Sequence, residues 1–285
     1  MSSPSTTAVP VPERKIGTVR RPGRLLGGLQ GPLVQAGEMT QLMLKVLGMA
    51  VRRPWGYWGE VRDQMFDILK LCWIPMAVSC TAFGLGAPGL QGGNLFNLFG
   101  IPERLGSFFI MASIREFAPW VNAMVVAGVV GTAITADLGA RRIREEIDAM
   151  EVLGVDPIRT LVLPRVIALF IMTGLLDLIA ALFGILGGYI AAVPILGANP
   201  AAFANSLFAN LSTTDVWGSV VKTALFGLII GVVCCYKGMR ASGGPIGVGR
   251  AVNQAVVIAF AAIWIFNMVF TTILLGLNPD IQVYR

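Results

Sequence analysis

The sequence contains few charged residues and no histidine. Charged residues make up 13% of the 285 residues, about half of the roughly 25% that soluble domains carry, which argues against a soluble protein. The absence of His removes the commonest general base, metal ligand and pH switch. The four Cys residues all lie in apolar segments, with the spacing of neither a disulfide framework nor a metal site.

Two catalytic motifs are also missing. The chain has no Gly-Lys dipeptide, so it cannot form a phosphate-binding loop of the G-x-x-x-x-G-K-[ST] type. No Ser occupies a G-x-S-x-G turn, which argues against a serine hydrolase. We therefore expect no catalytic residues, no metal and no cofactor in this chain. If ATP drives transport, a separate subunit must bind ATP and Mg²⁺ and hydrolyse the ATP.

Long stretches without charge indicate membrane spans. Such stretches cover residues 71–102, 117–136, 178–214 and 251–279. A hydrocarbon core of about 30 Å requires roughly 20 apolar helical residues. Allowing for single interruptions at Asp177 and Lys222, the pattern predicts five transmembrane helices, at about 70–87, 108–136, 162–192, 216–236 and 252–276.

The distribution of Lys and Arg predicts the orientation. Basic residues collect before the first predicted span, after the second and after the fourth. The alternate segments, 88–107, 193–215 and 277–285, contain only Arg104 and Arg285 as cations. By the positive-inside rule, we expect a multi-pass protein of the plasma (inner) membrane with a cytoplasmic N-terminus and an extracytoplasmic C-terminus. The net charge of +6 then reflects topology and not nucleic-acid binding.

The N-terminal region is predicted to hold a tail and a surface helix. Residues 1–37 are expected to form a disordered cytoplasmic tail, and 38–285 the membrane domain. Apolar residues then recur at the spacing of one helix face, at Met39, Leu42, Met43, Val46, Leu47 and Ala50. A basic and aromatic group follows, made of Arg52, Arg53, Pro54, Trp55, Tyr57 and Trp58. This pattern predicts an interfacial helix along the membrane surface.

The segment between the second and third spans carries an unusual charge pattern. Residues 141–154 are predicted to form one helix that ends at Gly154 and Pro157. Ile143, Ile147 and Met150 form one stripe of this helix, and Arg144, Asp148 and Glu151 lie on another face. Basic residues come first and acidic residues last, an order opposite to that favoured by the helix dipole. This indicates a charged surface kept for a partner; a solvated surface helix is the alternative.

Four charged residues fall inside or near predicted spans: Arg115, Glu116, Asp177 and Lys222. Ionisable groups in a membrane are costly and by default suggest function. Lys222 can instead snorkel to the headgroups, and Asp177 can form a buried pair or a helix-facing hydrogen bond. Pro119 predicts a locally irregular helix beside Arg115 and Glu116, bordering a cavity. Gly184 with Gly188 and Gly227 with Gly231 have the G-x-x-x-G spacing that permits close helix packing.

Several of these runs resemble one known family. They are Arg115-Glu116-Phe117-Ala118-Pro119, the segment from Ala127 to Ile134, the segment from Glu145 to Pro157, Pro164-Arg165, the segment from Cys235 to Gly238, and the segment from Gly247 to Ala251. Together they resemble the MlaE/YrbE permeases, the membrane subunits of ABC-type lipid transporters that work with MCE-domain proteins. The resemblance extends from about residue 38 to 277 and is closest to the actinobacterial YrbE type, which assembles as pairs of different permeases.

The resemblance implies an all-α integral membrane fold with an N-terminal interfacial helix, five spans and a cytoplasmic coupling helix between the second and third spans. That helix would dock on a cytoplasmic ABC ATPase subunit. The implied coupling residues are Glu145, Glu146, Asp148, Met150, Glu151 and Leu153. Arg144, which lies on the charged face of the same predicted helix, is expected to belong to this coupling surface as well. The implied substrate-binding residues, at a lipid cavity between two permease subunits, are Arg115, Glu116 and Phe117. The family often has Leu-Gly at Phe117-Ala118 and Arg at Val129.

The expected function is therefore that of a permease subunit that imports a hydrophobic lipid such as a fatty acid, a mycolic-type lipid or a sterol. Expected partners are the ATPase, a second YrbE-type permease in a homodimer or heterodimer, MCE-domain proteins and membrane lipid. The alternative is an ion-coupled secondary transporter that uses Asp177, Glu116 and Arg115.

Overall fold

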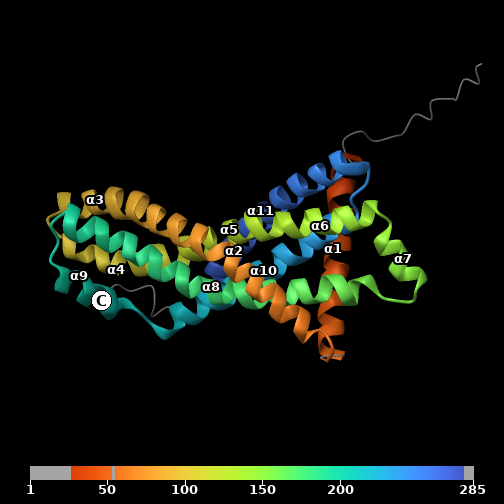
Figure 1. Ribbon diagram of the computed structural model, residues 1–285. Coiled ribbons are helices and arrows are strands. Elements are labelled where there is room, and N and C mark those ends of the chain that lie inside the picture. The colour runs from red at the N-terminus through yellow and green to blue at the C-terminus, as the bar shows by residue number, and fades with distance from the viewer. Residues whose placement is uncertain (1–26, 53–54, 279–285) are drawn as a thin grey trace, which may run out of the picture. The chain divides into compact units, whose positions relative to one another are not determined.

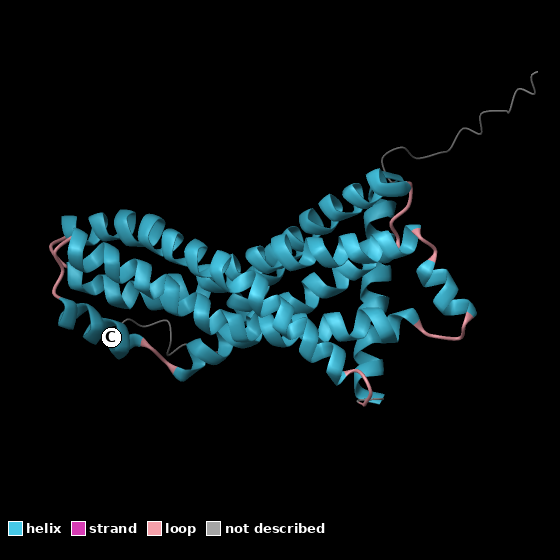
Figure 2. Cartoon of the chain, in the orientation of Figure 1, coloured by secondary structure: helices cyan, strands magenta, loops and turns pink. Residues whose placement is uncertain are grey.

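The computed structural model describes residues 27–52 and 55–278, and over these ranges the chain consists of helices joined by short turns (Figures 1 and 2). Five helical runs are long and apolar enough to cross a membrane. The prediction of an all-α membrane protein with five spans is therefore confirmed.

Each predicted span lies inside one helical run. The first run comprises α2 (Trp58–Gly84), the π-helical η1 (Leu85–Gly92) and α3 (Gly93–Leu98). The second comprises η2 (Pro102–Arg104), α4 (Leu105–Phe109), η3 (Ile110–Phe117), α5 (Ala118–Val126), η4 (Ala127–Gly131) and α6 (Thr132–Ile143). The third comprises η5 (Ile158–Val162), α8 (Leu163–Ile190) and η6 (Ala191–Ile195). The fourth is α10 (Thr213–Met239) and the fifth is α11 (Gly244–Leu277).

The first three runs are longer than a bilayer requires. They contain 41, 42 and 38 residues, which at 1.5 Å per residue corresponds to roughly 57–63 Å, about twice the thickness of the hydrocarbon core. These helices therefore continue beyond the apolar layer. The stretches without charge mark only the apolar part of each run, which is why they predicted shorter helices.

The third and fourth spans form the centre of the bundle. α8 packs against α2 and α10, and α10 also packs against α6 and α11. Leu169 and Leu176 of α8 and Phe226 and Ile230 of α10 are fully buried. α10 is the most buried of the five spans and α11 the least. One face of α11 is therefore left uncovered by this chain.

Glycines allow the central spans to approach closely. A Cβ atom on Gly227 of α10 would overlap the carbonyl oxygen of Leu169 in α8. A Cβ atom on Gly84 of α2 would overlap the carbonyl oxygen of Gly184, also in α8. Gly128, in contrast, has open space where a side chain would be. The close packing that the G-x-x-x-G spacing predicted is thus present within the chain.

One helix is absent from the sequence prediction. α9 (Pro200–Asn210) lies in the segment 193–215, for which the sequence pattern indicated no helix. It packs against α4, and its Phe203 is buried in an apolar cluster with Phe109. Its start has a recognisable signal, because the Asn199 side chain caps the helix and a proline occupies the first turn.

Helix α1 (Gly27–Arg52) precedes the spans, and the chain divides into two units between Glu38 and Met39, inside this helix. Residues 1–26 of the predicted tail lie outside the described residues. The segment 27–37 is helical, which differs from the predicted tail because its several glycines and a proline give little helical signal.

The part of α1 that belongs to the membrane unit turns its apolar face toward the spans. Val46 is fully buried, and Leu42 and Met43 pack against the main apolar cluster. Leu47 remains half exposed. The predicted apolar stripe therefore serves mainly to attach the helix to the protein.

Candidate functional site

A group of polar side chains lies inside the bundle where the second, fourth and fifth spans meet. We call it the buried polar cluster, and it consists of Arg115 and Glu116 of η3, Asp215 and Lys222 of α10, and Asn267 and Thr271 of α11. The segment η3 is a π-helical turn that ends two residues before Pro119. The irregular helix that the sequence predicted here is present, and π-helical turns often occur at functional sites.

Arg115 forms an ion pair with Asp215, one hundred residues further along the chain. Its Nε lies 2.6 Å from Oδ1 of Asp215, whose side chain is fully buried, whereas that of Arg115 is 10% exposed. The second carboxylate oxygen accepts hydrogen bonds from the backbone N–H and the hydroxyl of Ser212, at 3.1 and 2.9 Å. Asp215 therefore completes the capping box of α10, whose N-cap is Ser212, and neutralises Arg115 at the same time.

Glu116 links the second span to the fifth. Its Oε2 accepts a hydrogen bond from Nδ2 of Asn267 at 2.8 Å, and its Oε1 accepts one from the hydroxyl of Thr271 at 2.8 Å. The side chain is nevertheless 43% exposed. Glu116 is thus fixed in orientation and still accessible from the surface of the chain.

Lys222 points into the cluster. Its Nζ donates hydrogen bonds to the carbonyl oxygen of Arg115 and to the hydroxyl of Thr271, and it lies 3.8 Å from Oε1 of Glu116. The residue is only 2% exposed. The snorkelling interpretation is therefore wrong, since an acceptor carbonyl on η3 and the Glu116 carboxylate hold the ammonium group inside the protein.

Asp177 of α8 forms a second buried polar contact. The hydroxyl of Ser219 in α10 donates a hydrogen bond to its Oδ2, and Asp177 is almost completely buried. The expected helix-facing hydrogen bond is therefore present. Its other oxygen, Oδ1, has no hydrogen-bond partner among the described residues.

An aromatic row connects the first, second and fifth spans. The ring of Phe83 lies 5.1 Å from that of Phe117 and 6.1 Å from that of Trp120, and Trp120 lies 5.0 Å from Trp264. Phe117 is buried, whereas Phe83 and Trp264 are 37% and 54% exposed. Of the three predicted substrate-binding residues, Phe117 thus belongs to the packed interior. Its exposed aromatic neighbour is Phe83, and the other exposed ring of the row, Trp264, contacts Trp120.

The polar cluster and the aromatic row share one side of the second and fifth spans. Glu116 precedes Trp120 by four residues, and Trp264 precedes Asn267 by three, so each pair lies about one helical turn apart. This arrangement places a carboxylate beside exposed aromatic rings. Such a surface suits a molecule with an apolar body and a polar end.

The segment between the second and third spans forms a corner of two helices. α6 ends at Ile143, and α7 (Glu146–Val152) begins after Glu145, whose φ of 61° lies in the left-handed region. The prediction of a single helix over 141–154 is wrong, because the chain changes direction at Glu145. α7 nevertheless occupies the place of the expected coupling helix (Figure 1).

This break changes the interpretation of the charges. Arg141 and Arg142 stand in the last turn of α6, and Glu146 and Asp148 stand in the first turn of α7. Each therefore lies at the helix end whose dipole favours its sign, so the inferred conflict with the dipole is wrong. Arg141 pairs with Asp137 at 3.2 Å within α6.

Ion pairs hold the corner together. Arg142 pairs with Asp148, and Nε of Arg144 lies 2.7 Å from Oε1 of Glu146. The hydrogen bond to Glu146 raises the pKa of Arg144 above its ordinary value. Ile147 is buried beneath these pairs. The acidic side chains at the start of α7 are therefore largely used within the corner.

The end of α7 is the part that projects outward. We call Glu151, Val152 and Leu153 the α7 tip; Val152 and Leu153 are 88% and 79% exposed, and Glu151 is also exposed. Among the predicted coupling residues, Arg144, Glu145, Asp148, Glu151 and Leu153 are exposed, Glu146 is half-buried, and Met150 packs against the main apolar cluster.

The sequence prediction missed several members of the buried polar cluster, the aromatic row and the α7 tip: Phe83, Trp120, Val152, Asp215, Trp264, Asn267 and Thr271. For two of them a signal was available. Asn267 and Thr271 are polar residues four apart in an otherwise apolar helix, so they share one face and can bind the same partner. Asp215 gave no such signal, because it lies at the end of the segment 193–215, which the sequence pattern indicated to be a loop.

Comparison with known proteins identifies the family of the chain. The family model described as Permease MlaE matches residues 61–273, which is most of the chain. A probable ABC transporter permease protein of Rickettsia typhi is 35% identical over 201 residues, covering 70% of this chain and 78% of the relative. One from Rickettsia bellii is 34% identical over 235 residues, covering 82% and 90%.

A more distant relative comes from a plant. The protein named TRIGALACTOSYLDIACYLGLYCEROL 1, chloroplastic, of Arabidopsis thaliana is 32% identical over 177 residues, covering 62% of this chain and 51% of the relative. The family match covers all five spans in whole or in large part. This multi-pass membrane protein therefore belongs to the MlaE permease family and is an ABC transporter permease, whose ATPase is a partner protein.

Proposed function

We propose that this chain is the non-catalytic permease subunit of an ATP-driven lipid transporter that works with MCE-domain proteins. It would import a hydrophobic lipid, such as a fatty acid, a mycolic-type lipid or a sterol, across the plasma (inner) membrane. The ATPase partner would bind ATP and Mg²⁺. The positive-inside pattern supports a cytoplasmic N-terminus and an extracytoplasmic C-terminus.

The exposed α7 tip carries this proposal. Val152 and Leu153 are large apolar side chains with little burial in this chain. They stand beside Glu151 on a short helix whose base is fixed by ion pairs. A rigid base and an apolar tip suit a helix that inserts into a partner's groove. The chain lacks a phosphate-binding loop, so the ATPase is the partner that best fits this tip.

The aromatic row and the buried polar cluster support a lipid as substrate. Exposed rings of Phe83 and Trp264 would contact apolar chains, while Arg115 and Glu116 would lie near a polar end. The plant relative is named after a diacylglycerol lipid, which supports this substrate class.

The uncovered face of α11 supports a second permease subunit as partner. Val257, Ile265 and Met268 each have more than 60% of their surface exposed on this span. A copy of this chain or a related permease would cover such a face. The lipid would then move between the two subunits, next to the aromatic row.

Charge reversal at the α7 tip tests the proposal. The variant Glu151→Lys with Leu153→Asp should lose co-purification with the ATPase, because it changes the charge and the apolar surface that would contact the partner. The fold should be retained, because neither side chain makes an ion pair or hydrogen bond in the part of the chain that the structure describes. The control Glu103→Lys reverses an exposed charge in η2, which contacts α9 and not the corner of α6 and α7, and should retain the ATPase. Normal ATPase binding by the tip variant would contradict the proposal.

Family membership favours ATP-driven over ion-coupled transport. The observation that fits an ion-coupled carrier is the unpartnered Oδ1 of Asp177 among the described residues. Transport in vesicles that retain an ion gradient but contain no ATP would distinguish the two mechanisms.

A further inference from the structure

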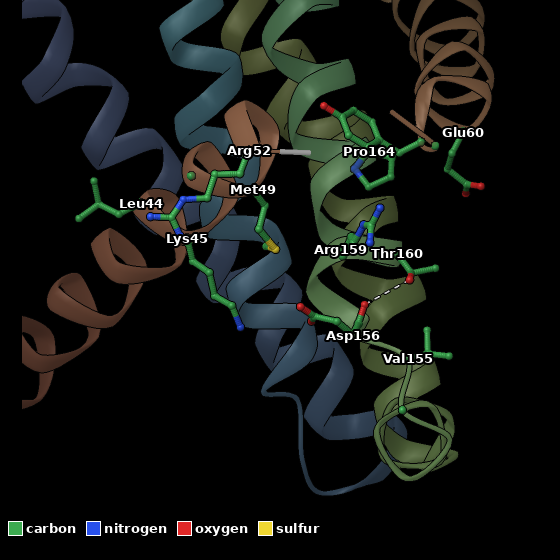
Figure 3. A pocket seen from close by; sticks show the side chains of 14 residues that line it. Leu44, Lys45, Met49, Arg52, Glu60, Val155, Asp156, Arg159, Thr160 and Pro164 are labelled. Carbon is green, nitrogen blue, oxygen red and sulfur yellow. Dashed lines mark hydrogen bonds between the residues drawn. The ribbon is translucent and has the colours of Figure 1, made fainter. Parts of the chain in front are cut away.

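A cavity lies beside the corner of α6 and α7, away from the buried polar cluster. Its volume is about 960 Å³. Its walls are the last turns of α1, the start of α2 and the segment that joins α7 to α8 (Figure 3). We call it the basic cavity. Neither the α7 tip nor the aromatic row contributes a side chain to it.

Cations line opposite walls of this cavity. Lys45 and Arg52 come from α1, and Arg159 comes from η5 (Figure 3). None of the three pairs with a carboxylate within residues 39–52 and 55–278. Two acidic residues, Glu60 and Asp156, also line the cavity, so its three cations exceed its carboxylates by one. The lining thus has an excess of cations, which favours an anionic ligand.

The same walls carry apolar side chains. Leu44 and Met49 of α1 line the cavity together with Val155 and Pro164. A free inorganic anion would gain nothing from these groups, whereas an amphiphile with an anionic head would bury its first methylene groups against them. A volume of about 960 Å³ is at the upper end of the roughly 300–1,000 Å³ typical of ligand pockets.

Aromatic residues beside the cavity indicate its depth in the membrane. Trp55 and Trp58 are 82% and 52% exposed, and Tyr57 lines the cavity. Trp and Tyr prefer the level of the lipid headgroups. The neighbouring Arg53 and Pro54 of the predicted basic and aromatic group lie outside the described residues.

Two glycines shape the walls. Gly56 and Gly154 both line the cavity and have φ angles of 102° and 77°. This left-handed region is open to glycine at little cost, so both turns depend on these residues. Gly48, on α1, has no atom within 4 Å of the place where a Cβ would be. The Cβ of a larger residue at Gly48 would therefore enter the cavity without a clash.

We propose that the basic cavity binds the phosphate of an anionic phospholipid from the adjacent leaflet, with Lys45 and Arg159 contacting the phosphate. Leu44 and Met49 would contact the upper part of an acyl chain. This site is separate from the transport path in the proposed function. An acidic segment of a partner protein is the competing occupant; the apolar lining and the flanking Trp residues favour the lipid.

Native mass spectrometry of the full-length protein in its assembled complex tests this. The complex is incubated with phosphatidylglycerol, with phosphatidylcholine and with inorganic phosphate. The wild type should retain phosphatidylglycerol. The variant Lys45→Gln with Arg159→Gln should bind it at least about tenfold more weakly, as expected when two cations near a phosphate are lost. The control Arg62→Gln with Arg250→Gln removes two exposed cations outside the cavity and should bind as the wild type does.

A second variant keeps all charges. Gly48→Leu should also reduce retention of phosphatidylglycerol, because its side chain would occupy the part of the cavity that α1 lines, and it decides the matter if the double variant fails to assemble. The proposal is overturned by equal binding of phosphatidylglycerol and phosphatidylcholine, by displacement of the lipid by inorganic phosphate, or by unchanged lipid binding in both variants. It is also overturned if the double variant loses the ATPase but keeps the lipid, since a protein segment would then occupy the cavity.

Discussion

Lys222 on the fourth span lies 3.8 Å from Glu116 on the second span and donates a hydrogen bond to the carbonyl oxygen of Arg115 next to it. One buried ammonium group thus satisfies a carboxylate and a backbone carbonyl on the same π-helical turn. Glu116 extends this contact to Asn267 and Thr271 of the fifth span. The cluster therefore ties three spans together at the place where we expect the lipid.

Removing this ammonium group should loosen the bundle. Lys222→Met leaves the Arg115 carbonyl without its donor and Glu116 without a nearby positive charge. Because Glu116 is partly exposed, we expect a loss of about 1–3 kcal/mol in the free energy of unfolding. Denaturant unfolding in detergent measures this. In the double variant with Glu116→Gln, part of the loss should be recovered, since the side chain at 116 is then no longer a carboxylate without its cation; a Lys222→Met protein as stable as the wild type would refute this role.

Arg115 should affect both stability and transport. Arg115→Gln breaks the 2.6 Å ion pair and leaves the buried Asp215 carboxylate without its cation, so the free energy of unfolding should fall. Adding Asp215→Asn should restore part of the stability. Lipid transport should stay low in the double variant if Arg115 contacts the lipid, and recovery of transport together with stability would show that Arg115 is only structural.

Packing between the third and fourth spans should depend on Gly227. In Gly227→Val the new side chain would overlap the carbonyl oxygen of Leu169, and we expect destabilisation of about 1–3 kcal/mol. The matched control is Gly128→Ala, where no atom lies within 4 Å of the place that the new Cβ would occupy; it should unfold at the same or a slightly higher temperature. Equal melting temperatures for both variants would argue against close contact of α8 and α10.

The corner between α6 and α7 should respond to the backbone at Glu145. Its φ of 61° is left-handed, a conformation that glycine adopts freely and a β-branched residue adopts poorly. Glu145→Gly should leave stability unchanged or raise it slightly, whereas Glu145→Val should lower it by roughly 1–2 kcal/mol. Thermal unfolding of both proteins tests this, and a stable Glu145→Val variant would mean that α6 and α7 form one continuous helix.

The sequence predicted the features that depend on local composition. Stretches without charge located all five spans, and Pro119 correctly indicated an irregular helix next to Arg115 and Glu116. The apolar stripe of α1 was also found. Each of these signals lies within a few residues of the structure that it predicts.

Features that depend on long-range contacts were not predictable from one sequence. Asp215 and Arg115 are separated by one hundred residues, and only the packing of α10 against η3 brings them together. The inward direction of Lys222 likewise depends on acceptors from two other spans. The break at Glu145 requires a left-handed residue, and glutamate gives no sign of it in the sequence.

The most direct test of an ATP-driven lipid permease is lipid movement in proteoliposomes that contain the assembled complex. Transfer of a fluorescent lipid is measured with ATP and no ion gradient, and with an ion gradient and no ATP. We predict transfer in the first condition only, and its loss in the Glu151→Lys and Leu153→Asp variant. Transfer driven by the gradient alone, or full ATP-dependent transfer by the variant, would contradict the proposed function.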